Sequence, residues 1–122
     1  MIKPNSDPGL ENLLVLDGES FVADRAGTLW VKFEVKAVEP CVRRPHGLKY
    51  SLTLHDEDGH RILGFDNAHP IRIGAGPGAK TKIEYDHKHE GERVRFYCYT
   101  DAFALLSDFW KEVESIVQER SL

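Results

Sequence analysis

Two alternating segments joined by a tight-turn dipeptide constrain the fold of this 122-residue chain more than any other feature. Apolar and polar residues alternate over residues 50–55, the dipeptide Asp58-Gly59 follows, and residues 61–65 return with mostly apolar side chains. A period of two places all apolar side chains on one face of a strand, and Asp-Gly is typical of a hairpin turn. These residues therefore predict an antiparallel hairpin with one buried face.

Further segments extend this hairpin into a sheet. Residues 30–37 alternate in the same way, and we expect residues 94–99 to form a last strand before the C-terminal region. The apolar run at 13–16 is followed by Asp17-Gly18, and we interpret it as a second hairpin that returns through Phe21-Val22.

Residues 101–118 carry the pattern of one amphipathic helix. Apolar side chains recur there at spacings of three and four, after Thr100 or Asp101 as the N-cap. The apolar stripe is wide enough to cover one face of a small antiparallel sheet. We therefore predict an α+β fold, in which a curved antiparallel sheet of about five or six strands carries the C-terminal helix packed on one face.

Length and composition indicate one domain, at residues 13–122, after a flexible lead-in at residues 1–12. No apolar run approaches the roughly 20 residues of a membrane span, and residues 1–5 do not lead into the apolar segment of a signal peptide. We expect a cytoplasmic protein that does not enter a membrane. Cys41 and Cys98 lack the CxxC spacing of redox and zinc motifs, so we expect two free thiols.

Charge is distributed unevenly along the chain. The formal net charge is −4, which argues against bulk electrostatic binding of nucleic acid. Residues 60–95, however, hold seven Lys or Arg against five Asp or Glu, together with four of the six histidines. A polyanion would be drawn to this middle segment, while the acidic flanks favour a basic protein partner.

Two polar motifs lie at expected strand ends, Gly64-Phe65-Asp66-Asn67-Ala68-His69 and Asp86-His87-Lys88-His89. The segment between them is rich in Gly and Pro at residues 73–80, and we expect residues 71–85 to be the least ordered internal stretch. Strand ends beside loops are common locations of binding and catalytic groups. We interpret the two motifs as halves of one site.

The second motif suggests acid–base chemistry on a phosphodiester. His87 and His89 are two residues apart, so in a strand both project from one face and Lys88 from the other. An imidazole titrates near neutral pH, and two of them can act as general acid and base. In this hypothesis Asp66 orients an imidazole, and Lys88 or Arg93 meets the developing phosphate charge.

The remaining candidates would bind substrate, and each has a structural alternative. Asn67 is expected to hold the phosphate with Lys88, and His69 and Tyr50 would line the substrate side. Asp and Asn are also favoured wherever a strand enters a turn, and Tyr50 lies on the apolar face of its strand, as a core residue would. A polar loop with exposed histidines would equally explain the second motif.

A metal site is a further alternative. His87 and His89 could bind an ion if His69, Asp66 or Asp86 supplied a third ligand. Their spacing matches no specific zinc signature, so we expect no cofactor. Lys80-Thr81 follows the Gly-rich segment, but Ala79 stands where the pattern of a nucleotide P-loop needs its last glycine, so the segment does not match a P-loop.

Four motifs in order resemble the TumE family of bacterial and archaeal toxins. They are Leu48-Lys49-Tyr50-Ser51-Leu52, Gly64-Phe65-Asp66-Asn67, Asp86-His87-Lys88-His89 and Leu105-Leu106-Ser107-Asp108-Phe109. The resemblance extends over roughly residues 13–118, nearly the whole chain.

The resemblance implies a cytoplasmic toxin that is neutralised by a cognate antitoxin, commonly a helix-turn-helix DNA-binding protein. RNA cleavage is inferred from toxins of similar size, which suggests a metal-independent endoribonuclease. The alternative is a non-catalytic binding module or a metal-binding inhibitor. The chain departs from the family pattern in its longer, Gly-rich connection and in Arg93-Val94-Arg95-Phe96, which stand where Pro-Tyr is usual before the last strand.

Overall fold

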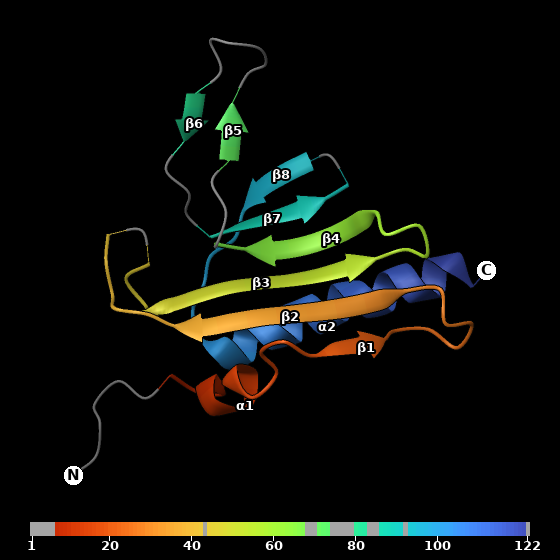
Figure 1. The fold of residues 1–122 in the computed structure, drawn as a ribbon, viewed down its shortest axis with the longest axis horizontal. Helices are drawn as coiled ribbons and strands as arrows, with labels where there is room; N and C mark the ends of the chain where they lie inside the picture. Colours follow the sequence, from red (N-terminus) through yellow and green to blue (C-terminus); the bar gives the residue numbers. More distant parts are fainter. Residues whose placement is uncertain are drawn as a thin grey trace.

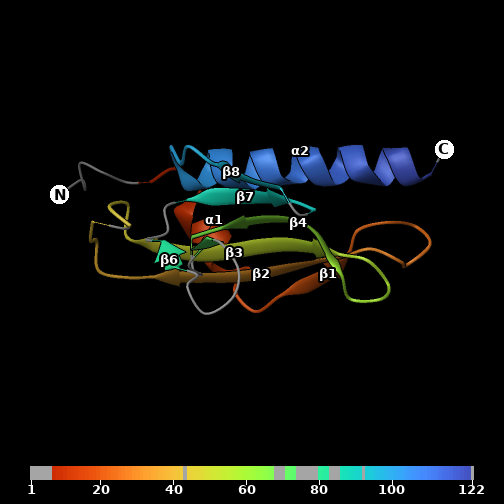
Figure 2. The same ribbon diagram turned by 90° about the horizontal axis from the view of Figure 1, so that it is seen from above.

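The computed structural model describes residues 7–42, 44–67, 71–73, 80–82, 86–91 and 93–121, with only the backbone described at 71–73 and 80–82. A sheet forms one layer, and a long C-terminal helix forms the other (Figures 1 and 2). The elements, in chain order, are α1 (Leu10–Leu14), β1 (Ser20–Val22), β2 (Trp30–Ala37), β3 (Leu48–His55), β4 (Arg61–Asp66), β5 (Ile71–Ile73), β6 (Lys80–Lys82), β7 (His87–Glu90), β8 (Arg93–Phe96) and α2 (Ala102–Arg120).

The main sheet has six strands in the order β1-β2-β3-β4-β7-β8, and every neighbouring pair is antiparallel. This arrangement confirms the predicted α+β fold with a C-terminal helix on one face. The hairpin predicted from the alternation is β3–β4, which carries a register irregularity between Leu54 and His55. Among the described residues, no helix combines the length and apolar character needed to cross a membrane.

The core lies between the sheet and α2. Phe109 of α2 is fully buried, and its ring lies 5.8 Å from the rings of both Phe33 on β2 and Phe65 on β4, measured between centroids. Both contacts are edge-to-face, the geometry that aromatic pairs prefer. In the view of Figure 1 the helix lies behind the sheet, so α2 does not cover the front face, which we call the open face.

Two aspartates fix the start of α2. Asp101 is the N-cap, and its side chain accepts a hydrogen bond from Ala104 N at 2.7 Å. Asp7 accepts from Ala102 N at 2.6 Å and from the hydroxyl of Tyr99. These bonds satisfy backbone donors that a helix leaves unpaired at its first turn.

The predicted N-terminal hairpin is wrong. Leu10, Leu13 and Leu14 have the spacing of a helix, and α1 forms where residues 13–16 were expected to be a strand. The helix begins inside the stretch expected to be a flexible lead-in, and β1 pairs with β2 alone. Gly9 has φ of 79°, and a Cβ there would approach Phe103 N to 2.9 Å, so this tight contact with the start of α2 needs glycine.

Two other boundaries differ from the predictions. The stretch 71–85, expected to be the least ordered internal segment, contains the separate two-stranded pair β5–β6, while its Gly-rich centre at 74–79 lies outside the described residues. The last strand ends at Phe96 instead of residue 99. Beyond it the Tyr97 hydroxyl donates to Asp108 of α2 at 2.7 Å, which ties the segment after β8 to the helix.

The packing of Phe109 predicts a large loss of stability on truncation. Phe109→Ala should lower the free energy of unfolding by about 3–5 kcal/mol, because it leaves a cavity against two aromatic rings. Phe103, on the same helix, is 68% exposed, and Phe103→Ala should change it by less than about 0.5 kcal/mol. Urea unfolding of both variants measures the difference. Equal losses would contradict this description of the core.

Candidate functional site

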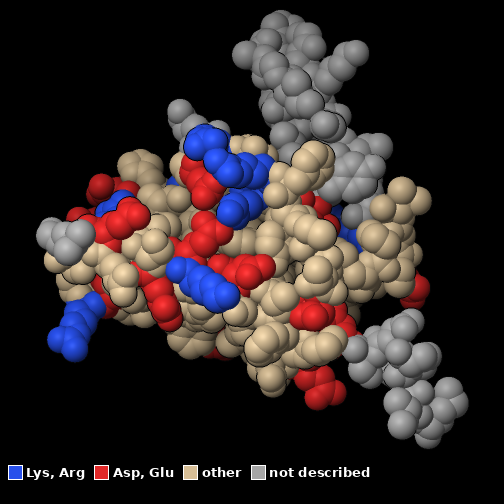
Figure 3. Space-filling model, turned by 180° about the vertical axis from the view of Figure 1, so that it is seen from behind, with Lys and Arg blue, Asp and Glu red and all other residues tan. Residues whose placement is uncertain are grey.

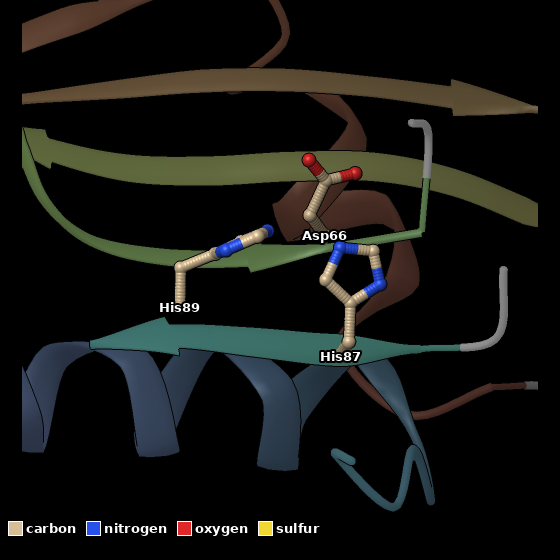
Figure 4. A group of neighbouring side chains, drawn as sticks. All are labelled: Asp66, His87 and His89. Carbon is tan, nitrogen blue, oxygen red and sulfur yellow. The ribbon is translucent and has the colours of Figure 1, made fainter. Parts of the chain in front are cut away.

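Strand pairing brings together three candidate residues. Asp66 on β4 lies directly opposite His87 on β7, and His89 follows two residues later on the same side (Figure 4). One potential ligand atom from each residue lies within 4.8 Å of the others. The two imidazole rings are edge-to-face, with centroids 4.8 Å apart. We call these three residues the Asp-His-His cluster.

The Asp-His-His cluster lies on the face of the sheet that α2 does not cover. The neighbours of Asp66 and His87 along their strands, Phe65 and Lys88, are paired with each other and contact the helix side. Successive side chains in a strand point to opposite faces. Asp66 and His87 are each only 2% exposed, whereas His89 is half-buried and gives solvent access to the cluster.

A groove on the open face adjoins the cluster at Asp66. It has a volume of about 380 Å³ and is lined by Lys32, Glu34, Ser51, Thr53, His55, Arg61 and Asp66. Gly64 leaves room for two of the lining residues, because a Cβ there would meet Arg61 Cδ at 3.2 Å and Thr53 Cγ2 at 3.5 Å. Without a side chain at Gly64, the aliphatic part of Arg61 lies close over the sheet.

The open face is more basic than the chain as a whole. On strands β2 to β4, the polar alternation places on it four basic and two acidic side chains: Lys32, Lys36, Lys49, Arg61, Glu34 and Asp66. Lys36 pairs with Asp17 at 2.5 Å. The opposite, helix-covered side carries acidic and basic side chains mixed together (Figure 3). Positive charge on the open face therefore contrasts with the net charge of −4.

Lys88 and Arg93 are not brought together with the histidines. Lys88 Nζ lies 2.7 Å from Glu112 of α2 and 5.7 Å from the centroid of the Phe65 ring, on the helix side. Arg93 is exposed on the edge strand β8, where it lies opposite Glu90 at the far end of β7. Arg61 and Lys32 are the basic residues among those that line the groove with Asp66.

Asn67 is bonded to the backbone of β3. Its side chain accepts from Tyr50 N at 2.8 Å and donates to Leu48 O at 2.7 Å, and it is fully buried. Its own carbonyl accepts from Arg44 Nη2 at 2.8 Å. These hydrogen bonds of Asn67 fix the end of β4 against β3. His69, the other residue expected here, lies outside the described residues.

Tyr50 belongs to a buried network centred on Asp86. Its hydroxyl donates to Asp86 Oδ2 at 2.8 Å, and His46 Nε2 lies 3.0 Å from the same oxygen. Leu48 N donates to Nδ1 of His46, so Nε2 carries the ring proton and donates it to Asp86. The His46 ring also packs on Tyr99, with centroids 4.1 Å apart. Asp86 is therefore bonded to Tyr50 and His46 on the helix side of the sheet, and it does not join His87 and His89.

A family comparison identifies the chain. The model of the family described as Toxin TumE matches residues 19–117. The chain belongs to the TumE toxin family. The resemblance carried by the four motifs is thus confirmed, and so is a toxin role for this protein. No curated protein and no solved structure matches the chain.

Sequence reasoning on this TumE-family chain missed the groove residues Lys32, Arg61, Ser51 and Thr53. Each lies at a polar position of an alternating strand, which by itself indicates only solvent exposure. The available signal was strand order, since adjacent placement of β2, β3 and β4 collects their polar positions on one face. In a sheet that a helix covers on one face only, every polar position on the other face is a candidate site residue.

The Asp86 network predicts a loss of stability in alkali. Burial first, and then the charge of Asp86, raise the pKa of Tyr50 well above its ordinary value. An unfolded tyrosine loses its proton near pH 10, so Tyr50 contributes full stability below that pH and progressively less above it. The free energy of unfolding of Tyr50→Phe should therefore fall less steeply than that of the wild type between about pH 9.5 and 11, by up to about 1.4 kcal/mol per pH unit.

Urea unfolding at a series of pH values measures this change in slope. At neutral pH the same variant should lower the free energy of unfolding by about 1–3 kcal/mol, because Asp86 loses a hydrogen-bond donor in a buried position. Parallel wild-type and variant curves above pH 10 would contradict the assignment.

Proposed function

We propose that this TumE-family toxin acts on RNA as a small, metal-independent endoribonuclease. The observation that carries the proposal is the Asp-His-His cluster, because two imidazoles and a carboxylate meet on an open face that is otherwise basic. Such a face attracts a polyanion, and paired imidazoles can move protons near neutral pH. The protein would act in the cytoplasm, where RNA is accessible.

The reaction needs a base and an acid on either side of one phosphodiester. One imidazole of the pair removes the proton of a ribose 2′-hydroxyl, whose oxygen attacks the adjacent phosphorus. The bond from phosphorus to the 5′-oxygen breaks, and the second imidazole donates the proton that this oxygen takes up. The products are a 2′,3′-cyclic phosphate and a 5′-hydroxyl, with no net change in protons.

Asp66 and the groove supply orientation and charge in this proposal. Asp66 lies opposite His87 across the β4–β7 pair, where a carboxylate can hold an imidazole in one tautomer and stabilise its protonated form. Arg61 and Lys32 line the adjoining groove and would bind the phosphates. They take the role expected for Lys88 and Asn67, whose side chains are engaged with Glu112 and the β3 backbone.

The chemistry is tested on His89, which is half-buried and easier to replace than His87. His89→Ala should reduce RNA cleavage by purified protein about 10²- to 10⁴-fold, the usual effect of losing a general acid or base. It should also abolish growth arrest on expression. His60→Ala is the matched control, because His60 lies in the exposed β3–β4 turn with its side chain 78% exposed, and it should keep both activities.

Three outcomes separate the alternatives. Cleavage that persists in excess chelator and depends on His89 supports the proposal. Cleavage that is lost with chelator indicates a metal-dependent nuclease. Growth arrest without any RNA cleavage favours a non-catalytic binding module or inhibitor, and overturns the ribonuclease proposal.

A cognate antitoxin is the proposed protein partner, in the form of a helix-turn-helix DNA-binding protein. The acidic flanks of the chain support a partner with a basic surface, since residues 1–59 and residues 96–122 each carry a formal net charge of −3. Co-expression with the product of the adjacent gene should restore growth, and the two proteins should co-purify. Growth arrest that persists despite expression of that product would contradict the pairing.

A further inference from the structure

We infer that the Asp-His-His cluster binds one divalent transition-metal ion of the zinc class. The sequence leaves the third ligand open between His69, Asp66 and Asp86, and His87 and His89 match no zinc signature by themselves. The third ligand comes from a different strand, where Asp66 is distant in sequence but directly opposite His87. The binding inference rests on geometry, and only its consequence for activity rests on the proposed function.

The donor set selects the type of ion. Two imidazole nitrogens and one carboxylate oxygen are typical ligands of zinc and of its transition-metal neighbours, whereas Mg²⁺ and Ca²⁺ prefer oxygen ligands throughout. Three protein ligands leave a fourth position for water or a phosphate oxygen. Because His89 is only half-buried, that position is reachable from the open face.

The geometry of the strands suits a tetrahedral ion. Zinc–nitrogen and zinc–oxygen bonds of about 2.0–2.2 Å place two ligand atoms roughly 3.3 Å apart. The three ligand atoms already lie within 4.8 Å of one another, so small side-chain rotations can close the set. Their backbones are held by the antiparallel pairing of β4 with β7, which reduces the entropy lost on binding.

A second cluster provides a contrast within the same chain. Asp56, Asp58 and His60 also place ligand atoms within 4.8 Å of one another, but they lie in the β3–β4 turn and His60 is exposed. Asp56 Oδ1 already accepts from Asp58 N and from His60 N, each at 2.9 Å, so this carboxylate stabilises the turn. His60→Ala therefore removes a histidine from a similar group without touching the proposed site.

A bound ion would inhibit the proposed ribonuclease. An imidazole that coordinates a metal uses the lone pair that a general base needs, and neither ring could then take up a proton from the ribose hydroxyl. Zinc would thus act as a reversible inhibitor of this site.

The experiment titrates metal-free, full-length protein with Zn²⁺ in competition with a chromophoric chelator. We expect one tightly bound ion per chain. His89→Ala and the near-isosteric Asp66→Asn should each weaken binding by more than the roughly 10- to 100-fold that loss of an outer-sphere partner causes. His60→Ala should bind as the wild type does, and Mg²⁺ should not compete. Circular dichroism confirms that each variant is folded.

Substitution with Co²⁺ provides a second readout, because a tetrahedral site with two imidazoles gives strong visible absorption bands. These bands should appear with the wild type and with His60→Ala, and disappear in His89→Ala. Absence of saturable Zn²⁺ binding, or equal affinity in wild type and His89→Ala, would overturn the inference. So would loss of binding in His60→Ala alone.

RNA cleavage measured in the same samples separates the two proposals. Cleavage in chelator that Zn²⁺ suppresses supports both the site and its inhibitory role. Cleavage that requires Zn²⁺ supports the site but overturns inhibition and metal-independent chemistry together. Zn²⁺ binding without any cleavage supports the site and overturns the ribonuclease proposal. Cleavage that Zn²⁺ does not alter, in protein shown to bind it, overturns the inhibitory role.

Discussion

The pairing of β4 with β7 is the constraint on which the site depends. With Asp66 opposite His87 and Phe65 opposite Lys88, one face of the pair presents the acid and imidazole groups while the other contacts α2. A slip of one residue would turn every side chain of the moved strand to the opposite face. Burial of Phe65 and the Lys88–Glu112 ion pair both oppose that slip, so packing on the helix side sets the chemistry on the open side.

Each polar motif combines a residue of the site with a buried anchor beside it in sequence. Asp66 faces the open side, whereas Asn67 bonds to the β3 backbone at Leu48 and Tyr50. In the second motif the order is reversed: Asp86 is held by Tyr50 and His46, and His87 after it faces Asp66. The anchors fix the strand ends at which the cluster is built, which gives a physical reason for Asp-Asn and Asp-His as adjacent pairs.

Sequence patterns predicted the elements whose burial has one clear period. The alternation at 30–37 and 50–55 gave β2 and β3, and the spacing of apolar residues at 101–118 gave α2. The prediction for the short run at 13–16 was wrong, because four aliphatic residues fit a strand or a helix, and packing against α2 and β2 decides between them. Likewise, the shared face of His87 and His89 follows from their spacing. The partner of Lys88 and the position of Arg61 do not, because they depend on which elements lie across the sheet.

Net charge is a poor guide to what this protein binds, because the fold sorts charges by face. Acidic residues outnumber basic ones in the whole chain, 20 against 16. Two of these acidic residues, Glu112 and Glu90, pair with Lys88 and Arg95 away from the cluster. The basic side chains of the groove adjoin the Asp-His-His cluster at Asp66. The absence of a side chain at Gly64 lets Arg61 lie close to the sheet. The proposed binding of RNA would therefore depend on the short-range field of this face, since charges beyond about 10 Å are largely screened at ordinary salt.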